Sequence, residues 1–383
     1  MSHLNLKSCV VSLTVSATFG LAGCGGSGSS SPTASPSTST PIPGFTQTNL
    51  IADLPGVATL TDPNLQNPWG IAFSPNGAFW LADNNSNLAT FYSGGKVAGT
   101  ITNDDPTGVQ IPFGSPSGQV FNGTTGFQVS NGTTTAPALF IFCSETGWID
   151  GWSPSVSSSQ AEASVDLSGV GAVFKGLAIG SNASGNYLFA TDFANAKIDV
   201  FDTNYNQATL SGSFTDPNIP SGFAPFGIQN INGTLYVTYA KQDATKHDDS
   251  KGPGNGYVDS FDTNGNLLGR LISRGNLNSP WGLTIAPTSF GQAGGMLLVG
   301  NFGDGKINVY NPSTGTYVGT LATANSAPIV IGGLWGLTFG NGGSGGDTTS
   351  LYFSSGPDSE THGVFGRLNA PSTGSNVRPA SKR

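Results

Sequence analysis

Six repeats, each about 50 residues long, constrain this chain more than any other feature of its sequence. Each repeat contains a glycine beside apolar residues, as in Trp69-Gly70-Ile71 and Trp335-Gly336-Leu337. The six glycines, which lie 56, 50, 51, 55 and 54 residues apart, are Gly70, Gly126, Gly176, Gly227, Gly282 and Gly336. A period of this length is typical of folds in which each repeat buries its apolar face against its neighbours.

Each repeat also predicts the same series of strands. A second apolar run follows the glycine strand, such as residues 187–191, and a third follows that, such as residues 197–202. Fourth strands are expected in repeats one to five, for example at residues 207–214, 267–272 and 317–321. Short β-branched and aromatic runs between Gly, Asn, Asp and Pro clusters are typical of strands joined by turns. The pattern predicts an all-β, six-bladed β-propeller with four-stranded blades, because the rungs of a β-helix, the alternative, are much shorter.

The ends of the repeat region predict how the ring closes. No fourth strand remains after residues 363–368, whereas residues 45–52 precede the first repeat as an additional strand. We expect this N-terminal strand to complete the last blade, which leaves no exposed sheet edge. The propeller then spans residues 45–370, and residues 371–383 form a polar C-terminal tail.

The first residues predict an export signal. Residues 1–23 contain Lys7, a moderately apolar stretch at 9–19 and small residues before position 24, as in a signal peptide. Leu21-Ala22-Gly23-Cys24 resembles the bacterial lipobox, which implies lipidation of Cys24. Ordinary secretion with cleavage nearby is the alternative.

The residues after Cys24 predict a spacer. Residues 24–44 are almost wholly Gly, Ser, Thr and Pro, a composition that cannot bury a core. Gly25 rather than Asp follows the cysteine, which resembles lipoproteins of the outer membrane. We therefore expect a lipid-anchored protein of the cell envelope, at the outer membrane if the host is Gram-negative.

Charge and cysteine content exclude several function classes. The chain has 14 Lys and Arg against 22 Asp and Glu, a net charge of −8, so a nucleic-acid partner is not expected. Cys143 is the one cysteine of the body, and we expect a buried apolar residue rather than a reactive thiol. No Gly-x-Ser-x-Gly elbow at a strand-to-helix turn, no phosphate loop and no paired-cysteine motif is recognised, so nucleophilic hydrolysis and nucleotide chemistry lack support. We expect a monomer.

Several motifs resemble known propeller families. The Gly-Ile/Leu strands, together with strands that end in Ala-Asp, Gly-Asn or Phe-Asp, are similar to NHL repeats. A closer resemblance is to a family of exported bacterial propellers without an assigned function. It rests on Asp62–Ile71, Thr238–Gly256 and Val299–Gly305. The resemblance implies the fold and leaves the chemistry open.

In such a propeller one face carries both the loops into the innermost strands and the loops after the second strands. The residues that we expect at this ligand-binding face are Trp69, Phe226, Trp281, Trp335, Asp83, Asn84, Asp304 and Asp358. Aromatic rings with carboxylates and amides suit a small polar ligand, a glycan or a peptide. The alternative is structural, since Trp can wedge between blades and Asp or Asn often caps a turn.

A metal-dependent enzyme is a further alternative. Gluconolactonase-like and streptogramin-lyase-like propellers hold a divalent ion at the channel mouth, which implies Ca²⁺ or Mg²⁺ as a cofactor. The candidate ligands are Glu145, Asp192, Asn301, Asp248 and Asp249, and the candidate bases are His247 and His362. The lack of a recognisable catalytic set favours a binding or interaction module over this hydrolase or lyase, and a purely structural spacer also stays open.

One loop concentrates charge. Residues 241–251 hold six charged side chains beside His247: Lys241, Asp243, Lys246, Asp248, Asp249 and Lys251. Functional loops on rigid scaffolds have this composition, and so do solvated insertions whose opposite charges pair locally. The sequence does not decide between these interpretations.

Overall fold

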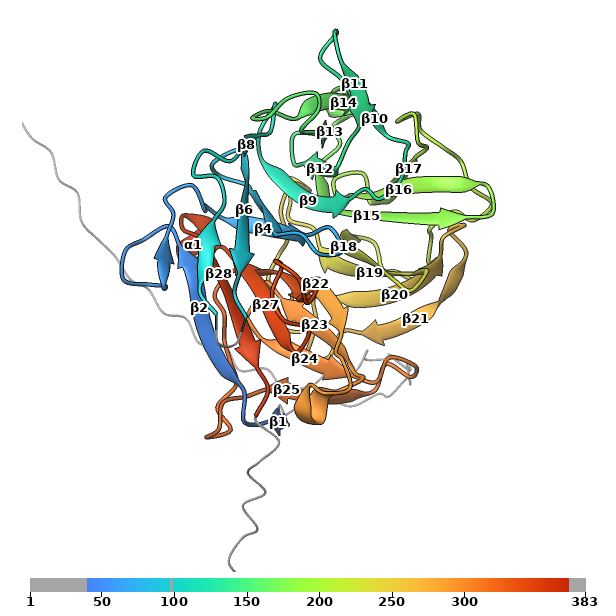
Figure 1. The fold of residues 1–383 in the computed structure, drawn as a ribbon. Helices are drawn as coiled ribbons and strands as arrows, with labels where there is room; N and C mark the ends of the chain where they lie inside the picture. Colours follow the sequence, from blue (N-terminus) through green and yellow to red (C-terminus); the bar gives the residue numbers. More distant parts are fainter. Residues whose placement is uncertain (1–39, 97–98, 372–383) are drawn as a thin grey trace, which may run out of the picture. The chain divides into compact units, whose positions relative to one another are not determined.

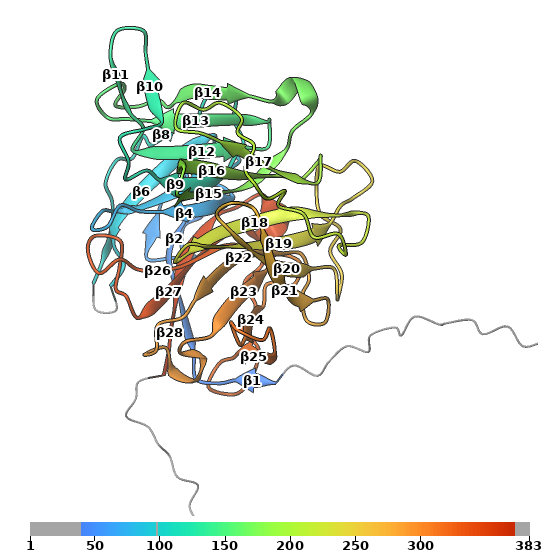
Figure 2. The ribbon, with the colours of Figure 1, turned by 90° about the vertical axis from the view of Figure 1, so that its right-hand side faces the viewer.

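The blades of the predicted propeller are present in the computed structural model, which describes residues 40–96 and 99–371. Within these residues six blade sheets follow one another around a central axis (Figures 1 and 2). The predicted signal peptide, Cys24, most of the predicted linker and residues 372–383 lie outside the described residues.

The first three blades are antiparallel sheets. In each of them the innermost strand comes first in the sequence, and the later strands of the blade lie farther from the axis. Blade one consists of β4 (Pro68–Ala72), β5 (Phe79–Asp83), β6 (Leu88–Gly94) and β7 (Ile101–Asn103), with β8 (Val109–Gln110) also paired to β6. Blade two consists of β9 (Pro116–Phe121), β12 (Phe140–Ser144), β13 (Trp148–Trp152) and β14 (Glu162–Asp166), with an inserted hairpin of β10 (Gln128–Ser130) and β11 (Thr135–Pro137). Blade three consists of β15 (Phe174–Asn182), β16 (Gly185–Asp192) and β17 (Lys197–Phe201).

The remaining blades contain four or five strands each. Blade four consists of β18 (Phe223–Ile231), β19 (Thr234–Lys241), β20 (Tyr257–Asp262) and β21 (Leu267–Ser273). Blade five consists of β22 (Pro280–Ile285), β23 (Leu297–Asn301), β24 (Ile307–Tyr310), β25 (Tyr317–Leu321) and β1 (Pro41–Ile42). Blade six consists of β26 (Leu334–Phe339), β27 (Ser350–Ser355), β28 (Val364–Asn369), β2 (Thr46–Ala52) and β3 (Leu60–Thr61).

Helical structure is limited to short turns in the described residues. These are the 3₁₀ turns η1 (Ser168–Val170) and η2 (Gly291–Ala293) and the four-residue α1 (Pro357–Glu360). Within the described ranges no helix has both the length and the apolar character needed to cross a membrane.

The predicted closure of the ring is confirmed. β2 runs antiparallel to β28, with Thr46 opposite Asn369 and Ala52 opposite Val364. The folded body begins slightly earlier than predicted, because β1 pairs in parallel with β25 and Ile42 is buried. Residues 41–44 therefore belong to the propeller and not to the linker. Pairing of both N-terminal strands covers edges that would otherwise stay open.

The predicted second repeat is wrong in its register. Gly118, not Gly126, lies in the innermost strand of blade two, because β9 is the strand that pairs with β12. Gly126 lies in the connection between β9 and β10. The inserted β10–β11 hairpin lengthens this connection, and the sequence Thr125-Gly126-Phe127 there imitates the pattern of an inner strand.

Blade three differs from the prediction of four strands. Residues 207–214 do not form a fourth strand beside β17. Their one contact of this kind is an isolated bridge between Gln207 and Phe201. The backbone N–H groups of Gly212 and Phe214 instead donate to Asn264 O and Gly265 O, at 2.8 and 3.0 Å, in the β20–β21 turn. The segment thus turns away to pack on blade four.

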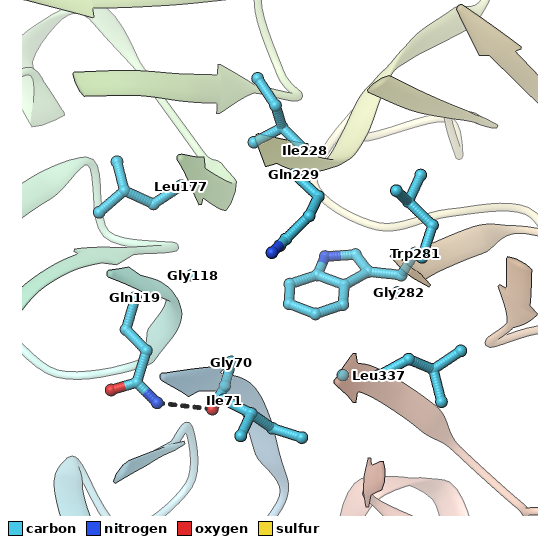
Figure 3. Close-up of a pocket in the computed structure, with 12 residues that line it drawn as sticks. Gly70, Ile71, Gly118, Gln119, Leu177, Ile228, Gln229, Trp281, Gly282 and Leu337 are labelled. Atoms are coloured by element: carbon cyan, nitrogen blue, oxygen red, sulfur yellow. Dashed lines mark hydrogen bonds between the residues drawn. The ribbon is translucent and has the colours of Figure 1, made fainter. Parts of the chain in front are cut away.

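The repeated glycine has a packing function. A Cβ atom at Gly70 would lie 2.8 Å from Ser117 O, and one at Gly336 would lie 2.7 Å from Trp69 O. These oxygens belong to the neighbouring inner strand, so only glycine lets the strands approach this closely around the axis. In Figure 3 the labelled glycines Gly70, Gly118 and Gly282 lie around this narrow channel, and the Gln229 amide and Trp281 ring extend toward its centre.

Candidate functional site

A cluster of aromatic rings closes one end of the channel. Trp69 and Trp335 stack with ring centroids 3.5 Å apart, and Phe302 stacks on Trp335 at 3.9 Å. Trp281 and Phe226 contact the same ring. The four predicted face aromatics are brought together as expected, but Trp281, the most accessible of them, is only 9% exposed. They form a packed floor rather than an open arc, and their contact with a ligand stays a prediction.

Two of the three indole N–H groups of this floor donate hydrogen bonds to the chain around it. Trp335 Nε1 donates to Asn67 Oδ1 at 3.0 Å, and Trp281 Nε1 donates to the backbone oxygen of Lys175 at 3.2 Å. These bonds fix the rings relative to the loops that lead into the inner strands. Since buried polar groups are costly unless paired, the bonds also stabilise the floor.

A buried lysine lies on the floor at the channel mouth. Lys175 precedes Gly176 in β15, the repeat position that Trp69 and Trp335 occupy in their own blades. Its side chain is 1% exposed, and its Nζ lies 5.2 Å from the centroid of the Trp69 ring. This is a cation–π arrangement in a desolvated setting.

Two carboxylates pair with the Lys175 ammonium. Glu145 accepts from it directly, and Asp248 Oδ1 lies 3.2 Å away. Asn84 Nδ2 donates to the other Glu145 oxygen at 2.8 Å. Burial lowers the pKa of Lys175, but the charges of Glu145 and Asp248 outweigh burial and hold that pKa above its usual value. Lys175 is therefore charged, and it joins blades two and three to the loop of blade four.

The charged loop between β19 and β20 reaches the channel mouth. Asp248 is 65% exposed and also lies 2.9 Å from His247 Nδ1. Lys251 lies over the Phe302 ring, with Nζ 4.0 Å from the centroid. Burial raises the pKa of the neighbouring Asp249. Two charges of the loop thus contact the rest of the propeller, whereas the His247–Asp248 contact is local, and a functional role for the loop stays a prediction.

The loop between β27 and β28 supplies a further carboxylate. Asn67 Nδ2 donates to Glu360 Oε2 at 3.1 Å, and Asn85 Nδ2 donates to Glu360 O at 2.6 Å. Burial raises the pKa of Glu360, and the charge of Glu145 raises it further. The channel mouth therefore presents both acidic and basic groups, which we define as Glu145, Lys175, Asp248, Lys251 and Glu360.

A partly exposed aromatic pair lies on the same face. Phe113 and Trp148 stack with centroids 3.8 Å apart and an interplanar angle of 8°, and Phe113 is 55% exposed. The pair is linked to the mouth because Glu145 N donates to Ser115 O at 3.0 Å. Phe113 was not predicted, because the inner strand of the second repeat was placed at Gly126. The loop that contains Phe113 leads into β9, the inner strand of blade two. Lys175 was not predicted either, although that residue is the one charged side chain at the position before an inner-strand glycine.

Several other predicted residues contribute to local turns. Asp83 accepts from Thr90, and Asp192 accepts from Asn195 and from Val173 N. Asn301 donates to Asn276 O at 2.8 Å and to Asp304, and Asp304 also pairs with Lys306. Those contacts match the capping alternative stated above. A ligand or metal role for these four residues stays a prediction.

Asp358 and His362 lie toward the outside of blade six. His362 Nδ1 lies 2.7 Å from Asp53 Oδ2, so the histidine pairs with the connection after β2 and not with the channel-mouth groups.

Cys143 is buried as expected, and burial raises the pKa of its thiol to about 12. A thiol with this pKa is not a nucleophile at neutral pH.

The fit of a divalent ion to the mouth depends on Lys175. Ligand atoms of Glu145, His247 and Asp248 all lie within 4.8 Å of one another, which is close enough to surround an ion. However, the Lys175 ammonium is bonded to both carboxylates of this group. A divalent ion there would face a buried positive charge, so the donor set does not fit a metal while Lys175 remains paired.

Two curated relatives of this chain come from a virus. Uncharacterized protein R648 of Acanthamoeba polyphaga mimivirus is 37% identical over 297 residues, covering 75% of this chain and 72% of the viral protein. The chain belongs to the same protein family. Uncharacterized protein L690 of that virus, another member, is 34% identical over 336 residues and covers 83% of this chain and 84% of the viral protein. Both of these members are viral, so they do not support the expectation that the family is bacterial.

No family model matches the chain. Among solved structures, virginiamycin B lyase from Staphylococcus aureus gives a TM-score of 0.46 at 16% identity, covering 85% of this chain and 98% of the lyase. A putative gluconolactonase gives 0.38 at 16% identity, covering 65% of this chain and 91% of that protein. Similarity at this level says nothing about activity in this family.

Proposed function

We propose that this protein is a binding module whose ligand occupies the channel mouth and the adjacent Phe113–Trp148 pair. The observation that carries the proposal is the pairing of the buried Lys175 ammonium with Glu145 and Asp248. This pairing provides a rigid, charged surface above a closed aromatic floor, and it opposes the metal on which the alternative hydrolase or lyase depends. Binding surfaces commonly combine a few fixed polar groups with aromatic contacts.

The chemistry of the mouth favours a glycan as the ligand. The free face of the Phe113 ring suits the C–H face of a sugar ring, because the other face is covered by Trp148. Carboxylates, amides and an ammonium nearby include both acceptors and donors, as a polyhydroxylated ligand requires. Rigid aromatic side chains give such surfaces contact area at low entropic cost.

The test is a glycan array probed with residues 40–383, which contain the propeller. We expect specific glycan binding that Phe113→Ala and Asp248→Asn each weaken by about tenfold, an effect of roughly 1.4 kcal/mol. Leu268→Ala is the matched control, because Leu268 is 59% exposed on β21, in blade four. The proposal fails if no glycan binds, or if binding is equally strong in the Phe113 variant. Binding to a peptide array alone would show that the ligand class is wrong.

We also propose that Cys24 is lipidated and tethers the propeller to the cell envelope. The support is the lipobox-like run Leu21–Cys24 and the Gly/Ser/Thr/Pro-rich segment after it. The full chain, expressed in a bacterium, should fractionate with membranes, and Cys24→Ser should release it to the soluble fraction. Equal fractionation of the two proteins would contradict the tether.

A further inference from the structure

A second pocket lies outside the channel mouth, on blade six. It is bounded by the connection between β2 and β3, by the segment before β26 and by the loop between β27 and β28. The space measures about 250 Å³. For comparison, a dry protein cavity of about 150 Å³ is large enough to bind benzene. The pocket therefore has room for a small organic molecule.

The walls of this pocket are unusually apolar for exposed surface. Leu54, Val57 and Val330 are 39%, 42% and 59% exposed, and all three line it. The described residues contain seven exposed large apolar side chains, so three of the seven gather here. Below them Ile331 and Phe353 form a buried floor. Exposed apolar side chains gathered at a concave site are typical of ligand contact.

The polar end of the pocket offers hydrogen-bond acceptors. Asp53 accepts from His362 Nδ1 at 2.7 Å and from Gly363 N at 3.1 Å. Because a carboxylate can only accept, the Nδ1 atom of His362 carries a proton in this pair. Asp358 also lines the pocket and adds a second carboxylate. A ligand that meets these groups must donate hydrogen bonds.

The loop that carries Asp358 has a strained backbone. Asp358, Ser359 and Glu360 have φ values of 52°, 58° and 67°, three successive non-glycine residues in the left-handed region. Non-glycine residues adopt this region only at an energetic cost, because Cβ approaches the following carbonyl oxygen. This conformation directs Glu360 to the channel mouth through Asn67 while Asp358 remains at the pocket. Strain of this kind concentrates at functional sites.

We propose that this pocket binds a small primary amine with an apolar body. The ammonium lies at the carboxylates of Asp53 and Asp358, and the apolar body lies against Leu54, Val57 and Val330. An ammonium supplies three donors and a positive charge that complements the two carboxylates. A carboxylate ligand would instead be repelled by both of them.

The experiment compares three probes of similar size by isothermal titration with residues 40–383 at pH 8. We expect n-hexylamine to bind one saturable site, 1-hexanol to bind at least tenfold more weakly, and hexanoate not to bind. Asp358→Asn should weaken hexylamine by about fivefold, whereas Asp104→Asn, an exposed acid in blade one, should not. Val330→Ala should weaken the amine and the alcohol alike, which separates the apolar contact from the charge.

The outcomes that overturn this site differ from those that overturn the glycan proposal. Equal binding of amine, alcohol and carboxylate, or no saturable binding of hexylamine, would reject the amine pocket. So would a hexylamine affinity that Asp358→Asn leaves unchanged. If Phe113→Ala rather than Asp358→Asn lowers the affinity for hexylamine, the amine binds at the channel mouth and the pocket on blade six is not its site.

Discussion

Lys175 belongs to β15 in blade three, and its ammonium lies 3.2 Å from the carboxylate of Asp248 in the loop of blade four. One partner is almost completely buried and the other is 65% exposed. Together with Glu145 the pair joins three consecutive blades at the channel mouth. A buried charge of this kind gives a site a fixed geometry, and it is costly to leave without partners.

Lys175→Met should destabilise the propeller strongly. The variant leaves Glu145, which is 11% exposed, without its ammonium partner, and breaking a buried pair costs about 3–5 kcal/mol. Chemical denaturation measures the change in the free energy of unfolding. Lys306→Met is the control. The Lys306 side chain is 36% exposed and its partner Asp304 is 29% exposed, so this pair should contribute only about 0–1 kcal/mol to stability. Similar losses in the two variants would contradict the role given to Lys175.

Divalent ions should leave the melting temperature of the wild-type propeller unchanged. The Lys175 ammonium occupies the carboxylates that would otherwise hold an ion. An ion that bound the folded state at about 100 times its dissociation constant would add roughly 2.7 kcal/mol, a readily visible shift. Thermal melts with chelator, then with Ca²⁺, Mg²⁺ or Zn²⁺, make the measurement. A reversible rise that Glu145→Gln abolishes would revive the metal-dependent alternative.

Asp150→Asn should change how stability depends on pH. Asp150 is fully buried in β13, and burial raises its pKa from 3.8 to about 8. Between these values the folded state retains a proton that the unfolded state has released, so stability falls as pH rises from about 4 to 8. At about 1.4 kcal/mol for each unit of pKa, the loss should reach several kcal/mol.

The measurement for Asp150 is the difference between variant and wild type at pH 5 and pH 8. The asparagine cannot ionise, so the wild type should lose more stability over this range than Asp150→Asn. Asp259, whose pKa burial raises to about 7, titrates in both proteins and cancels in the difference. Parallel pH profiles would show that Asp150 is not protonated in the folded state.

Gly70→Ala should destabilise the ring, because the new Cβ would meet the backbone of β9 at Ser117 O. Overpacking of this kind costs about 1–3 kcal/mol. Gly269→Ala provides the control, since a Cβ at that position in β21 meets nothing within 4 Å. The comparison of urea midpoints tests whether the inner-strand glycines are required for close approach. Equal midpoints would mean that the blades shift apart at little cost.

The six-fold repetition was readable in the sequence because the same local requirement recurs in every blade. Five of the six inner-strand glycines were identified, and the closing strand before the first repeat was identified as well. The second repeat was misplaced because an inserted hairpin carries a similar tripeptide. The missing fourth strand of blade three depends on contacts between residues 207–214 and blade four, which short-range patterns do not contain.

Sequence patterns also indicated which face carries polar loops, since Asn84, Glu145 and Asp248 do meet there. They did not indicate that the tryptophans pack into a closed floor, or that Lys175 lies on it. Strand periodicity and turn chemistry are local, so they indicated five of the six inner strands, the order of the blades and the closing strand. Which side chains become neighbours at the axis depends on how six blades, separated by tens of residues, come together. The position of the Lys175 ammonium between the carboxylates of the channel mouth depends on these long-range contacts, so local sequence patterns do not contain it.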